Sequence, residues 1–285
     1  MKVLFIGCGD IAQRAAREMQ TRHKCFGLRR QPDNLPEYIQ PIKADATDAE
    51  QLFSVASEGF DIWIATITPG EFTEQAYKDS YLAAAESIAT SIAKLQKAPR
   101  LVLWVSSTSV YGDLKGDWVN EETQPEPNTF SGKILLAAEK IIQQIPCETS
   151  AIRFSGIYGP GRTRLLSQVL AGKGRPSSPE QWSNRVHADD CGGILAHLVE
   201  YALSANPLLP EYLASDSAPV TQHEVRQWLA AQLAVGLVEE KVKLGSVRRC
   251  DNSRLLSSGY QFKYPTYKEG YAKLINDRKL ADGSK

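Results

Sequence analysis

Five short apolar segments alternate with helical patterns over the first 155 residues, and this alternation limits the possible folds more than any other feature. Helical patterns lie near residues 11–21, 48–57, 72–96 and 131–144. Strands that are apolar throughout and separated by helices are typical of a parallel sheet covered on both faces. Right-handed crossovers then give an α/β fold with a doubly wound parallel sheet. The predicted strands are KVLFIG (2–7), KCFGL (24–28), DIWIATI (61–67), RLVLWVSS (100–107) and TSAIRFS (149–155).

The second part of the chain has a different pattern. From about residue 156, IYGPGR and GKGRPSSPEQWSN are rich in Gly, Pro and Ser and indicate loops. Helices are predicted again near 189–203 and 221–235, with a strand at EYLAS (211–215) and two helices around a turn at Gly259 near the end. We therefore predict two domains. Residues 1–155 form the sheet, and residues 156–285 form a small α/β lobe that is interleaved with that sheet.

Composition excludes several classes of protein. Lys and Arg together number 33, as do Asp and Glu, so the formal net charge is zero. That balance gives no electrostatic reason to expect nucleic acid or an anionic membrane as a partner. No apolar run approaches the ~20 residues that cross a bilayer. The five cysteines are odd in number and lack CxxC spacing, which argues against a disulfide framework and a metal site. We expect a cytoplasmic protein.

GCGDIA (7–12) stands between the first predicted strand and the first predicted helix. The GxGxxG fingerprint needs one Gly for a tight turn, a second for close approach of a diphosphate, and a small third residue for packing of helix on strand. Gly7, Gly9 and Ala12 satisfy it, with Asp10 and Ile11 between them. Free N–H groups at a helix start favour an anion. The turn therefore predicts a Rossmann-type NAD(P)-binding domain rather than an ordinary connection.

The end of the second strand indicates which cofactor is bound. An NAD site is expected to carry an acid there, about twenty residues after the turn, but GLRR places Arg29 and Arg30 instead. Two guanidiniums suit a 2′-phosphate through charge-assisted hydrogen bonds. NADP is the predicted cofactor; NAD is the alternative if these arginines are only solvated surface side chains. Asp45, after a predicted third strand, either frames the adenine or caps the following helix together with Thr47.

Five motifs in order along the chain resemble those of the extended and atypical short-chain dehydrogenase/reductases, the NAD(P)-dependent epimerase/dehydratase-like group. The resemblance covers nearly the whole chain and includes members described only as nucleoside-diphosphate-sugar epimerases or oxidoreductases. It implies a Rossmann sheet with a C-terminal substrate lobe. The matching motifs are GCGDIA, VSSTSVYGD (105–113), SGKILLAAE (131–139), AIRFSGIYGPGR (151–162) and NRVHADD (184–190), followed by the ending GY…YPTYKEGY.

The resemblance also implies catalytic positions. The family serine falls on Ser107, with Thr108 as a close rival, and the family lysine falls on Lys133. In the family this lysine binds the nicotinamide ribose and lowers the pKa of a tyrosine four residues earlier. Here that position is Thr129, a far weaker acid than a phenol. The family's asparagine aligns loosely with Tyr81, so two of the four catalytic positions are altered.

Three interpretations of Thr129 stay open. In the first, the acid has moved, with Tyr81, Tyr158 and His187 as candidates; each of these could instead be a packed structural side chain. In the second, the protein binds NADP(H) without catalysis, as a redox sensor or regulator. In the third, the enzyme needs no tyrosine acid because water or the substrate itself supplies the proton.

In the lobe, Arg162, Arg164 and Arg185 favour an anionic substrate, and Trp182 offers a stacking surface. We also assign Thr108, Tyr158 and His187 to the substrate region. The short lobe favours a substrate smaller than a full nucleotide sugar. The resemblance suggests a homodimer formed by the helices at 72–96 and 131–144, although the same small residues suit packing within one chain.

The sequence as a whole predicts an NADP(H)-dependent oxidoreductase or epimerase-like enzyme that acts on a small substrate. The alternative is a non-catalytic NADP(H)-binding sensor.

Overall fold

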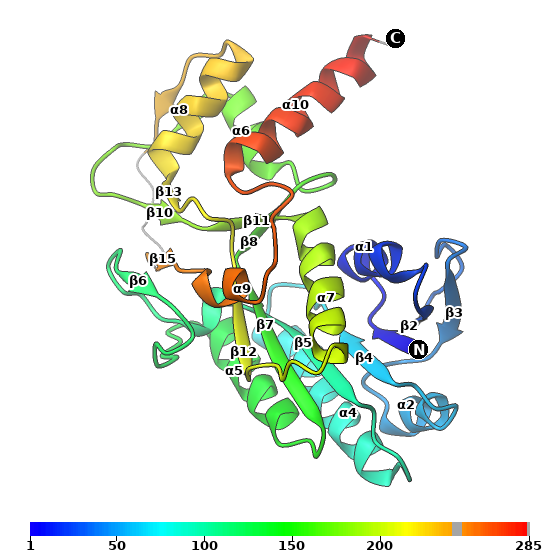
Figure 1. The fold of residues 1–285 in the computed structure, drawn as a ribbon. Helices are drawn as coiled ribbons and strands as arrows, with labels where there is room; N and C mark the ends of the chain where they lie inside the picture. The colour runs from blue at the N-terminus through cyan, green and yellow to red at the C-terminus, as the bar shows by residue number, and fades with distance from the viewer. Residues whose placement is uncertain (241–246, 284–285) are drawn as a thin grey trace. The chain divides into compact units, whose positions relative to one another are not determined.

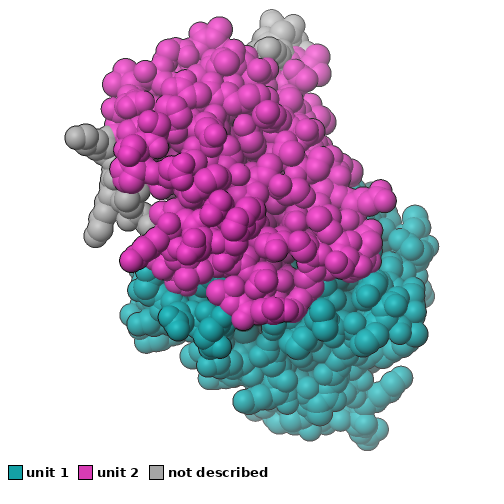
Figure 2. All heavy atoms as spheres, turned by 60° about the vertical axis from the view of Figure 1, so that its left-hand side comes forward, with its two compact units in different colours: residues 1–111, 124–153, 191–212 teal, residues 112–123, 154–190, 213–285 magenta. Residues whose placement is uncertain are grey.

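The structure is a computed structural model that describes residues 1–240 and 247–283. The chain divides into two compact units, which Figure 2 shows in different colours. Unit 1 contains residues 1–111, 124–153 and 191–212, and unit 2 contains residues 112–123, 154–190 and 213–285. The domain boundary at residue 155 stays a prediction, because compactness alone does not show that a segment folds independently.

A seven-stranded sheet forms the framework, with strands in the order β12-β7-β5-β4-β1-β2-β3 (Figure 1). The pairs β1–β2, β1–β4, β2–β3 and β4–β5 are all parallel. This arrangement confirms the predicted α/β fold of Rossmann type. The strands are β1 (Lys2–Ile6), β2 (Lys24–Arg29), β3 (Ile39–Lys43), β4 (Ile62–Ala65), β5 (Leu101–Ser107), β7 (Glu148–Phe154) and β12 (Glu211–Ala214).

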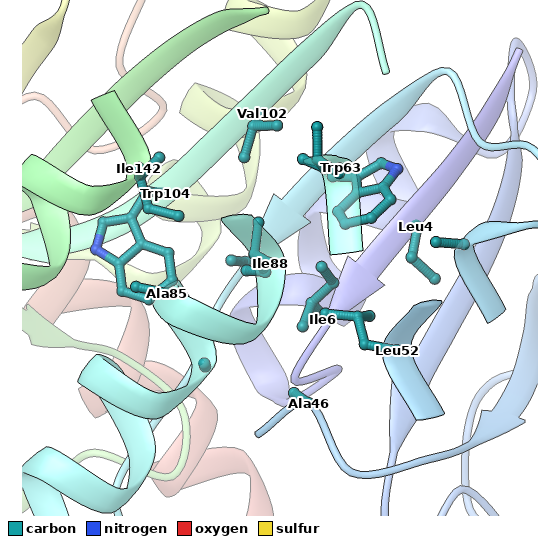
Figure 3. Packing of buried hydrophobic residues seen from close by; sticks show 14 of the residues in the cluster. Leu4, Ile6, Ala46, Leu52, Trp63, Ala85, Ile88, Val102, Trp104 and Ile142 are labelled. Carbon is teal, nitrogen blue, oxygen red and sulfur yellow. The ribbon is translucent and has the colours of Figure 1, made fainter. Parts of the chain in front are cut away.

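The central strands are buried on both faces, which explains why their sequences are apolar throughout. All four residues of β4 are buried. On one face Trp63 and Trp104 pack with Leu52 and Ile88 from the covering helices (Figure 3). Each such side chain contributes about 1.5–3 kcal/mol through burial. The helices of this part of the chain are α1 (Asp10–Met19), α2 (Ala49–Ala56), α3 (Glu74–Tyr77), α4 (Ala83–Lys94), α5 (Phe130–Gln143) and α7 (Ala188–Leu203).

The predicted helical segment near 72–96 is present and runs from Glu74 to Lys94, but it is not a regular α-helix throughout. A π-helical turn, η1 (Lys78–Leu82), separates α3 from α4. The Ser80 hydroxyl donates to the carbonyls of Ala76 (2.6 Å) and Tyr77 (3.4 Å) within this turn. Such bonds to the preceding turn compete with the regular helical ladder, and π turns are frequent at functional sites. Apolar periodicity alone does not reveal the extra residue.

The face of α4 that was considered for a dimer lies in the core of unit 1. Ala84, Ala85, Ile88 and Ile92 are buried there. These residues serve packing within the chain, and the homodimer stays a prediction. Within the described residues, no helix is long and apolar enough to cross a membrane.

Unit 2 holds short strands and a second apolar cluster centred on Val225, Leu229 and Tyr271. The interpretation of IYGPGR as a loop only is wrong, because its first residues continue into β8, which pairs in parallel with β11. The helix α6, directly after this segment, was not predicted. The elements are β6 (Trp118–Val119), β8 (Gly156–Tyr158), α6 (Arg164–Leu170), β9 (Lys173–Gly174), β10 (Trp182–Ser183), β11 (Arg185–His187), β13 (Val220–Thr221), α8 (Gln222–Leu233), β14 (Val238–Glu239), β15 (Arg249–Cys250), α9 (Ser253–Ser257) and α10 (Tyr267–Gly283).

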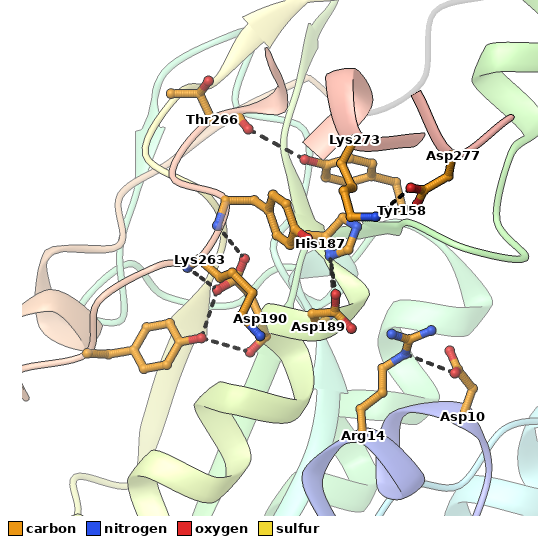
Figure 4. A network of polar contacts seen from close by, with 12 residues as sticks. Asp10, Arg14, Tyr158, His187, Asp189, Asp190, Lys263, Thr266, Lys273 and Asp277 are labelled. Atoms are coloured by element: carbon orange, nitrogen blue, oxygen red, sulfur yellow. Dashed lines mark hydrogen bonds and ion pairs between the residues drawn. The ribbon is translucent and has the colours of Figure 1, made fainter. Parts of the chain in front are cut away.

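Asp190 fixes the segment that leads into α10 (Figure 4). Its carboxylate accepts hydrogen bonds from the Tyr260 hydroxyl (2.8 Å) and from the backbone N–H groups of Lys263 (2.7 Å) and Tyr264 (3.0 Å). A buried carboxylate persists where such donors satisfy it. The GY…YP ending therefore has a structural role, because it is held by the last residue of NRVHADD.

Candidate cofactor and substrate sites

Unit 1 contains a pocket of about 800 Å³ at the carboxyl ends of its first strands. In parallel α/β sheets the carboxyl ends of the strands form the ligand crevice. The turn after β1, the ends of β2 and β3, the residues after β4, and η1 all contribute to its wall. The lining includes the predicted residues Gly7, Gly9, Arg29, Arg30 and Asp45.

The glycine turn is shaped for a ligand that approaches the backbone. Gly7 has φ +77°, and a Cβ there would lie 3.0 Å from Ile67 Cδ1 and 3.2 Å from the Thr66 carbonyl oxygen. A Cβ at Gly9 would meet only the Gly7 oxygen, at 3.9 Å, and would stand where the pocket is open. No side chain caps the first turn of α1. The open backbone and the uncapped helix start fit a diphosphate.

The other predicted turn residues, Asp10, Ile11 and Ala12, do not line the pocket but help to hold the turn in place. Asp10 begins α1 and forms an ion pair with Arg14 at 2.9 Å (Figure 4). Ile11 and Ala12 are buried. Burial of Ala12 is what the third position of the fingerprint requires, because the helix packs closely on the strand.

Arg29 and Arg30 both line the pocket, and their exposures differ. Arg29 is half-buried, and its Nη1 donates to the Cys8 carbonyl at 3.5 Å, whereas Arg30 is exposed. Asp45, across the pocket, accepts hydrogen bonds from the N–H (3.0 Å) and hydroxyl (2.8 Å) of Thr47. The alternative that Asp45 caps the next helix is wrong, because Asp48 is the N-cap of α2.

The predicted Ser107 and Lys133 lie on neighbouring elements of unit 1. Ser107 ends β5, and its hydroxyl accepts a hydrogen bond from the Ser109 N–H at 3.2 Å; Thr108 beside it is buried. The helix α5 packs closely on this strand end, because a Cβ at Gly132 would lie only 2.3 Å from the Ser109 carbonyl oxygen. Lys133 follows Gly132 and is exposed. Glycine at this position therefore brings the lysine helix close to the serine.

Thr129 has a structural function at the start of α5. It is the N-cap residue, and its hydroxyl accepts from the Gly132 N–H at 3.2 Å and shares a hydrogen bond with the Ser131 hydroxyl at 3.1 Å. Phe130, the next residue, packs its ring against Phe72 (5.1 Å) and Tyr77 (5.5 Å). An aromatic cluster therefore forms around Phe130, next to the helix cap.

Tyr81 lies in η1 and packs against the rings of Tyr77 (5.3 Å) and Trp104 (6.4 Å). Burial, together with Tyr77, raises the pKa of Tyr81 well above its ordinary value. This is the opposite of the shift that a nearby lysine would cause. Tyr77 itself was missed by the sequence analysis, as were the pocket-lining residues Thr66, Asp79 and Ser80, which lie in the loop after β4 and in η1.

Unit 2 contains a second pocket, of about 570 Å³. It brings together the predicted residues Tyr158, Arg162, Arg164 and Arg185, to which Arg226 is added. Arg226 was not predicted, although the sequence contained one signal. On α8 it lies between the apolar residues Val225 and Leu229, on the face of the helix that is buried, where an apolar residue is expected.

His187 and Trp182 do not line this pocket. His187 is buried between the rings of Tyr158 (5.2 Å) and Tyr264 (4.0 Å), and its Nδ1 accepts from the Asp189 N–H at 3.1 Å. The Trp182 indole N–H donates to Glu180, and its ring lies 4.9 Å from the Arg249 guanidinium. These contacts favour structural roles, and the substrate roles of both residues stay predictions.

Tyr158 is held from two sides. Its ring stacks on Tyr271 at 4.6 Å, and its hydroxyl points at Gly270, where a Cβ would lie 2.0 Å away. Burial raises the pKa of Tyr158 far above the ordinary value, with Asp216 as the next cause. As a relocated acid it would be harder to ionise than a free phenol.

Comparison with known proteins identifies the family. The chain is 32% identical to a candidate NAD-dependent epimerase/dehydratase from Methylobacillus flagellatus, with a TM-score of 0.82 over 98% of both chains. The chain belongs to the NAD-dependent epimerase/dehydratase family. It is also 30% identical over 193 residues to the Escherichia coli protein YeeZ, and this match spans 65% of the length of each protein. No protein-family model matches the chain.

Two more distant members with solved structures share the fold. The UDP-glucuronic acid 4-epimerase of Bacillus cereus, solved with UDP-glucuronic acid and NAD, is 17% identical with a TM-score of 0.79 over 95% of this chain and 96% of that chain. The human epimerase family protein SDR39U1, solved with NADPH, is 18% identical with a TM-score of 0.74 over 93% of this chain and 96% of that chain. At this identity the likeness shows the fold alone.

Proposed function

We propose that the protein is an NADP(H)-dependent oxidoreductase or epimerase of this family that acts on a small anionic substrate. The observation that carries the proposal is the pocket of unit 1, where a glycine turn and two arginines line one wall. Relatives solved with NAD and with NADPH support a nicotinamide dinucleotide as the cofactor. The arginines of the unit 2 pocket support an anionic substrate.

The choice of NADP rests on Arg29 and Arg30. Arg29 is steadied by the Cys8 carbonyl and Arg30 is exposed, so both guanidiniums are available to a 2′-phosphate. Hydrogen bonds to a charged group are worth about 1.5–3 kcal/mol each. At about 1.4 kcal/mol per factor of ten, one such contact favours NADP over NAD about tenfold or more.

When bound, the nicotinamide accepts or donates a hydride. In this proposal the exposed Lys133 ammonium binds the nicotinamide ribose, as the family motif implies. The Ser107 hydroxyl donates a hydrogen bond to the substrate oxygen at which charge changes. Thr129 takes no part in proton transfer in this proposal, because an aliphatic hydroxyl is a far weaker acid than a phenol; its hydroxyl serves as the helix cap.

A second function has specific observations in its favour. Thr129 replaces the family phenol with a cap, and the pKa of Tyr81 is shifted upward rather than toward neutrality. Both observations suit a protein that binds NADP(H) as a sensor and performs no hydride transfer. Lys133 would then hold the cofactor only.

Fluorescence titration of the purified protein with NADPH and with NADH tests the cofactor. We expect NADPH to bind at least tenfold more tightly than NADH, and Arg29→Ala to remove most of that preference without weakening NADH. Arg100→Ala, which removes an exposed cation that does not line the pocket, is the control. Equal affinity for the two nucleotides would refute the arginine assignment, and binding of neither would refute the proposed function.

A second experiment separates enzyme from sensor. NADPH oxidation is followed at saturating cofactor with a panel of phosphorylated sugars, aldehydes and ketones. On the enzyme proposal, one class is reduced and Lys133→Met abolishes that turnover, whereas Lys140→Met, on the same helix, does not. If turnover survives Lys133→Met, the role given to Lys133 is wrong. If no class is turned over while NADPH binds tightly, the sensor function is favoured.

A further inference from the structure

The aromatic cluster of unit 1, formed by Phe72, Tyr77 and Phe130, leaves one apolar ring largely in contact with solvent. The Phe72 ring lies 5.1 Å from that of Phe130 and 5.6 Å from that of Tyr77, yet 73% of Phe72 is exposed. Tyr77 and Phe130 are half-buried. Exposed apolar side chains that gather at one place on a protein surface often mark a site where a ligand binds.

The start of α3 explains where Phe72 lies but not its exposure. Thr73 is the N-cap of α3, and its hydroxyl accepts a hydrogen bond from the Ala76 N–H at 3.2 Å. Phe72 precedes the cap and packs on Tyr77, the fourth residue of the helix, as a hydrophobic staple does. Its second contact, with Phe130, comes from the start of α5. The two contacts leave most of the ring uncovered, so packing alone does not account for an apolar residue here.

The ring orientations keep the cluster open. Tyr77 stands nearly perpendicular to both phenyl rings, at 88° to Phe72 and 85° to Phe130, and the two phenyl rings are tilted by 54° to each other. Edge-to-face contacts of this kind leave ring faces available, whereas stacked rings would cover them. A further flat ring can therefore join the cluster without displacing its members.

The cluster lies next to the residue that the proposed function assigns to the cofactor. Phe130 and Lys133 are three residues apart on α5, so they are neighbours on the helix surface. On α3, Glu74 lies one turn before Tyr77. The pKa of Glu74 is lowered mainly by its ion pair with Lys78, and the charge of Lys133 lowers it further. The two helix starts that carry the rings therefore come together beside the Lys133 ammonium.

The same segment borders the cofactor pocket of unit 1. Gly70 lies two residues before Phe72, Ala76 directly precedes Tyr77, and both Gly70 and Ala76 line that pocket. The rings themselves do not line it. If Lys133 holds the nicotinamide ribose, as proposed, the reacting end of a substrate must come close to this edge of the pocket.

The chemistry of the three side chains favours a flat, apolar group. Only Tyr77 carries a polar atom, whereas a sugar ring needs hydrogen-bond partners for several hydroxyl groups around its rim. Burial raises the pKa of Tyr77, so its hydroxyl is protonated at neutral pH and can donate one hydrogen bond. One donor beside two phenyl rings suits an aromatic ring better than a sugar.

We propose that the substrate presents an aromatic ring to the cluster of Phe72, Tyr77 and Phe130, beside Lys133. This deepens the proposed function and rests on it, because Lys133 has its role at the cofactor only in that proposal. The bound ring covers the exposed surface of Phe72 and removes apolar surface of both partners from water. The cluster is then the part of the protein that selects an aryl substrate over a saturated one.

Two methyl ketones with the same number of carbon atoms test this selection. Acetophenone carries a flat phenyl group, and acetylcyclohexane carries a puckered saturated ring in its place. Their dissociation constants are measured by ligand-observed NMR with the full chain saturated with NADP⁺, the oxidised cofactor, which cannot reduce them. We expect acetophenone to bind about tenfold more tightly, through its contacts with the aromatic rings. Equal binding of the two ketones, or binding of neither, overturns the inference.

Phe72→Ala should abolish this preference and leave NADPH affinity unchanged, because Phe72 does not line the cofactor pocket. The variant should fold, since the side chain is largely exposed. Phe72→Tyr keeps a ring at this position and should keep the preference. Trp118→Ala, which removes an exposed ring of unit 2, is the control and should also keep it. A preference that survives Phe72→Ala overturns the inference.

Sedimentation velocity of the wild type and of Phe72→Ala tests a different occupant of the cluster. A wild-type dimer that Phe72→Ala dissociates would mean that a second copy of the chain covers the rings, and the inference would be overturned. The same sedimentation behaviour for both proteins supports a cluster that is open to substrate.

NADPH titration separates this inference from the proposed function. Tight NADPH binding without a preference between the ketones refutes the aromatic substrate alone. If NADPH does not bind, the proposed function fails, and the two ketones are then measured with the protein alone. A preference for acetophenone that Phe72→Ala removes would still support the aromatic site, and equal binding would overturn it as well.

Discussion

The Thr129 hydroxyl accepts a hydrogen bond from the Gly132 N–H at 3.2 Å and so caps the helix that carries Lys133. An N-cap needs a short acceptor side chain, and a tyrosine at this position could not supply one. The resemblance implies that the family phenol would stand at this position, and on that alignment the chain carries a helix cap there in place of a proton donor.

Thr129→Ala should lower the free energy of unfolding by about 1 kcal/mol, the usual cost of losing an N-cap. NADPH affinity should change little, because the backbone of the cofactor turn lies elsewhere in unit 1. Urea denaturation and fluorescence titration measure the two effects. Thr129→Ser keeps the acceptor and should behave like the wild type. Unchanged stability combined with lost NADPH binding would contradict the cap assignment.

The buried pair formed by Glu139 and Arg153 should be the costliest single contact to break in unit 1. Arg153 Nη2 lies 2.7 Å from Glu139 Oε2, and its Nη1 donates to the Tyr111 hydroxyl at 2.9 Å. Glu139→Gln leaves the buried guanidinium without its counter-charge, so we expect a loss of about 3–5 kcal/mol in urea denaturation. Glu74→Gln, which breaks an exposed pair with Lys78, is the comparison and should have no measurable effect.

Stability should depend on pH through Asp216. Its folded pKa is raised to about 7, so between the unfolded value near 4 and pH 7 the folded state binds more protons than the unfolded state. The free energy of unfolding therefore falls as pH rises through this window, by up to about 4 kcal/mol, and is level above it.

Asp216→Asn keeps the acceptor for the Ala218 N–H and removes the titration. In urea denaturation of both proteins at pH 5, 6, 7 and 8, the free energy of unfolding of the variant should rise relative to that of the wild type as pH rises. A constant difference across that range would mean that Asp216 does not titrate there.

The features that sequence could predict are those fixed by neighbours in the chain. The glycine turn is one, because its shape depends on Gly7 and Gly9, which lie within three residues of each other. The apolar strands are another, since β4 is buried on both faces and its sequence is apolar throughout. The η1 turn was missed because it depends on Ser80 bonding to two carbonyls, which changes no apolar position.

Other features depend on contacts between distant residues. Asp48, not Asp45, caps α2, and the choice is decided by which carboxylate faces the N–H groups of Glu50 and Gln51. Arg226 lies 41 positions from Arg185, and only the fold of unit 2 brings both to one pocket. The separation in sequence gave no sign that the two arginines share a pocket, and Arg226 was not predicted as a site residue.

Gly132→Ala should disturb the contact between α5 and the end of β5. The added Cβ would lie 2.3 Å from the Ser109 carbonyl oxygen and 2.8 Å from Pro127 Cβ, and a backbone atom cannot rotate away as a flexible side chain does. The helix must therefore shift away from Ser107 and take Lys133 with it. Overpacking of this kind costs about 1–3 kcal/mol. We expect a lower urea midpoint and weaker NADPH binding together, since Lys133 loses its position. Gly236→Ala is the control, because a Cβ there meets no atom within 4 Å. If Gly132→Ala lowers stability and leaves NADPH affinity intact, Lys133 does not hold the cofactor.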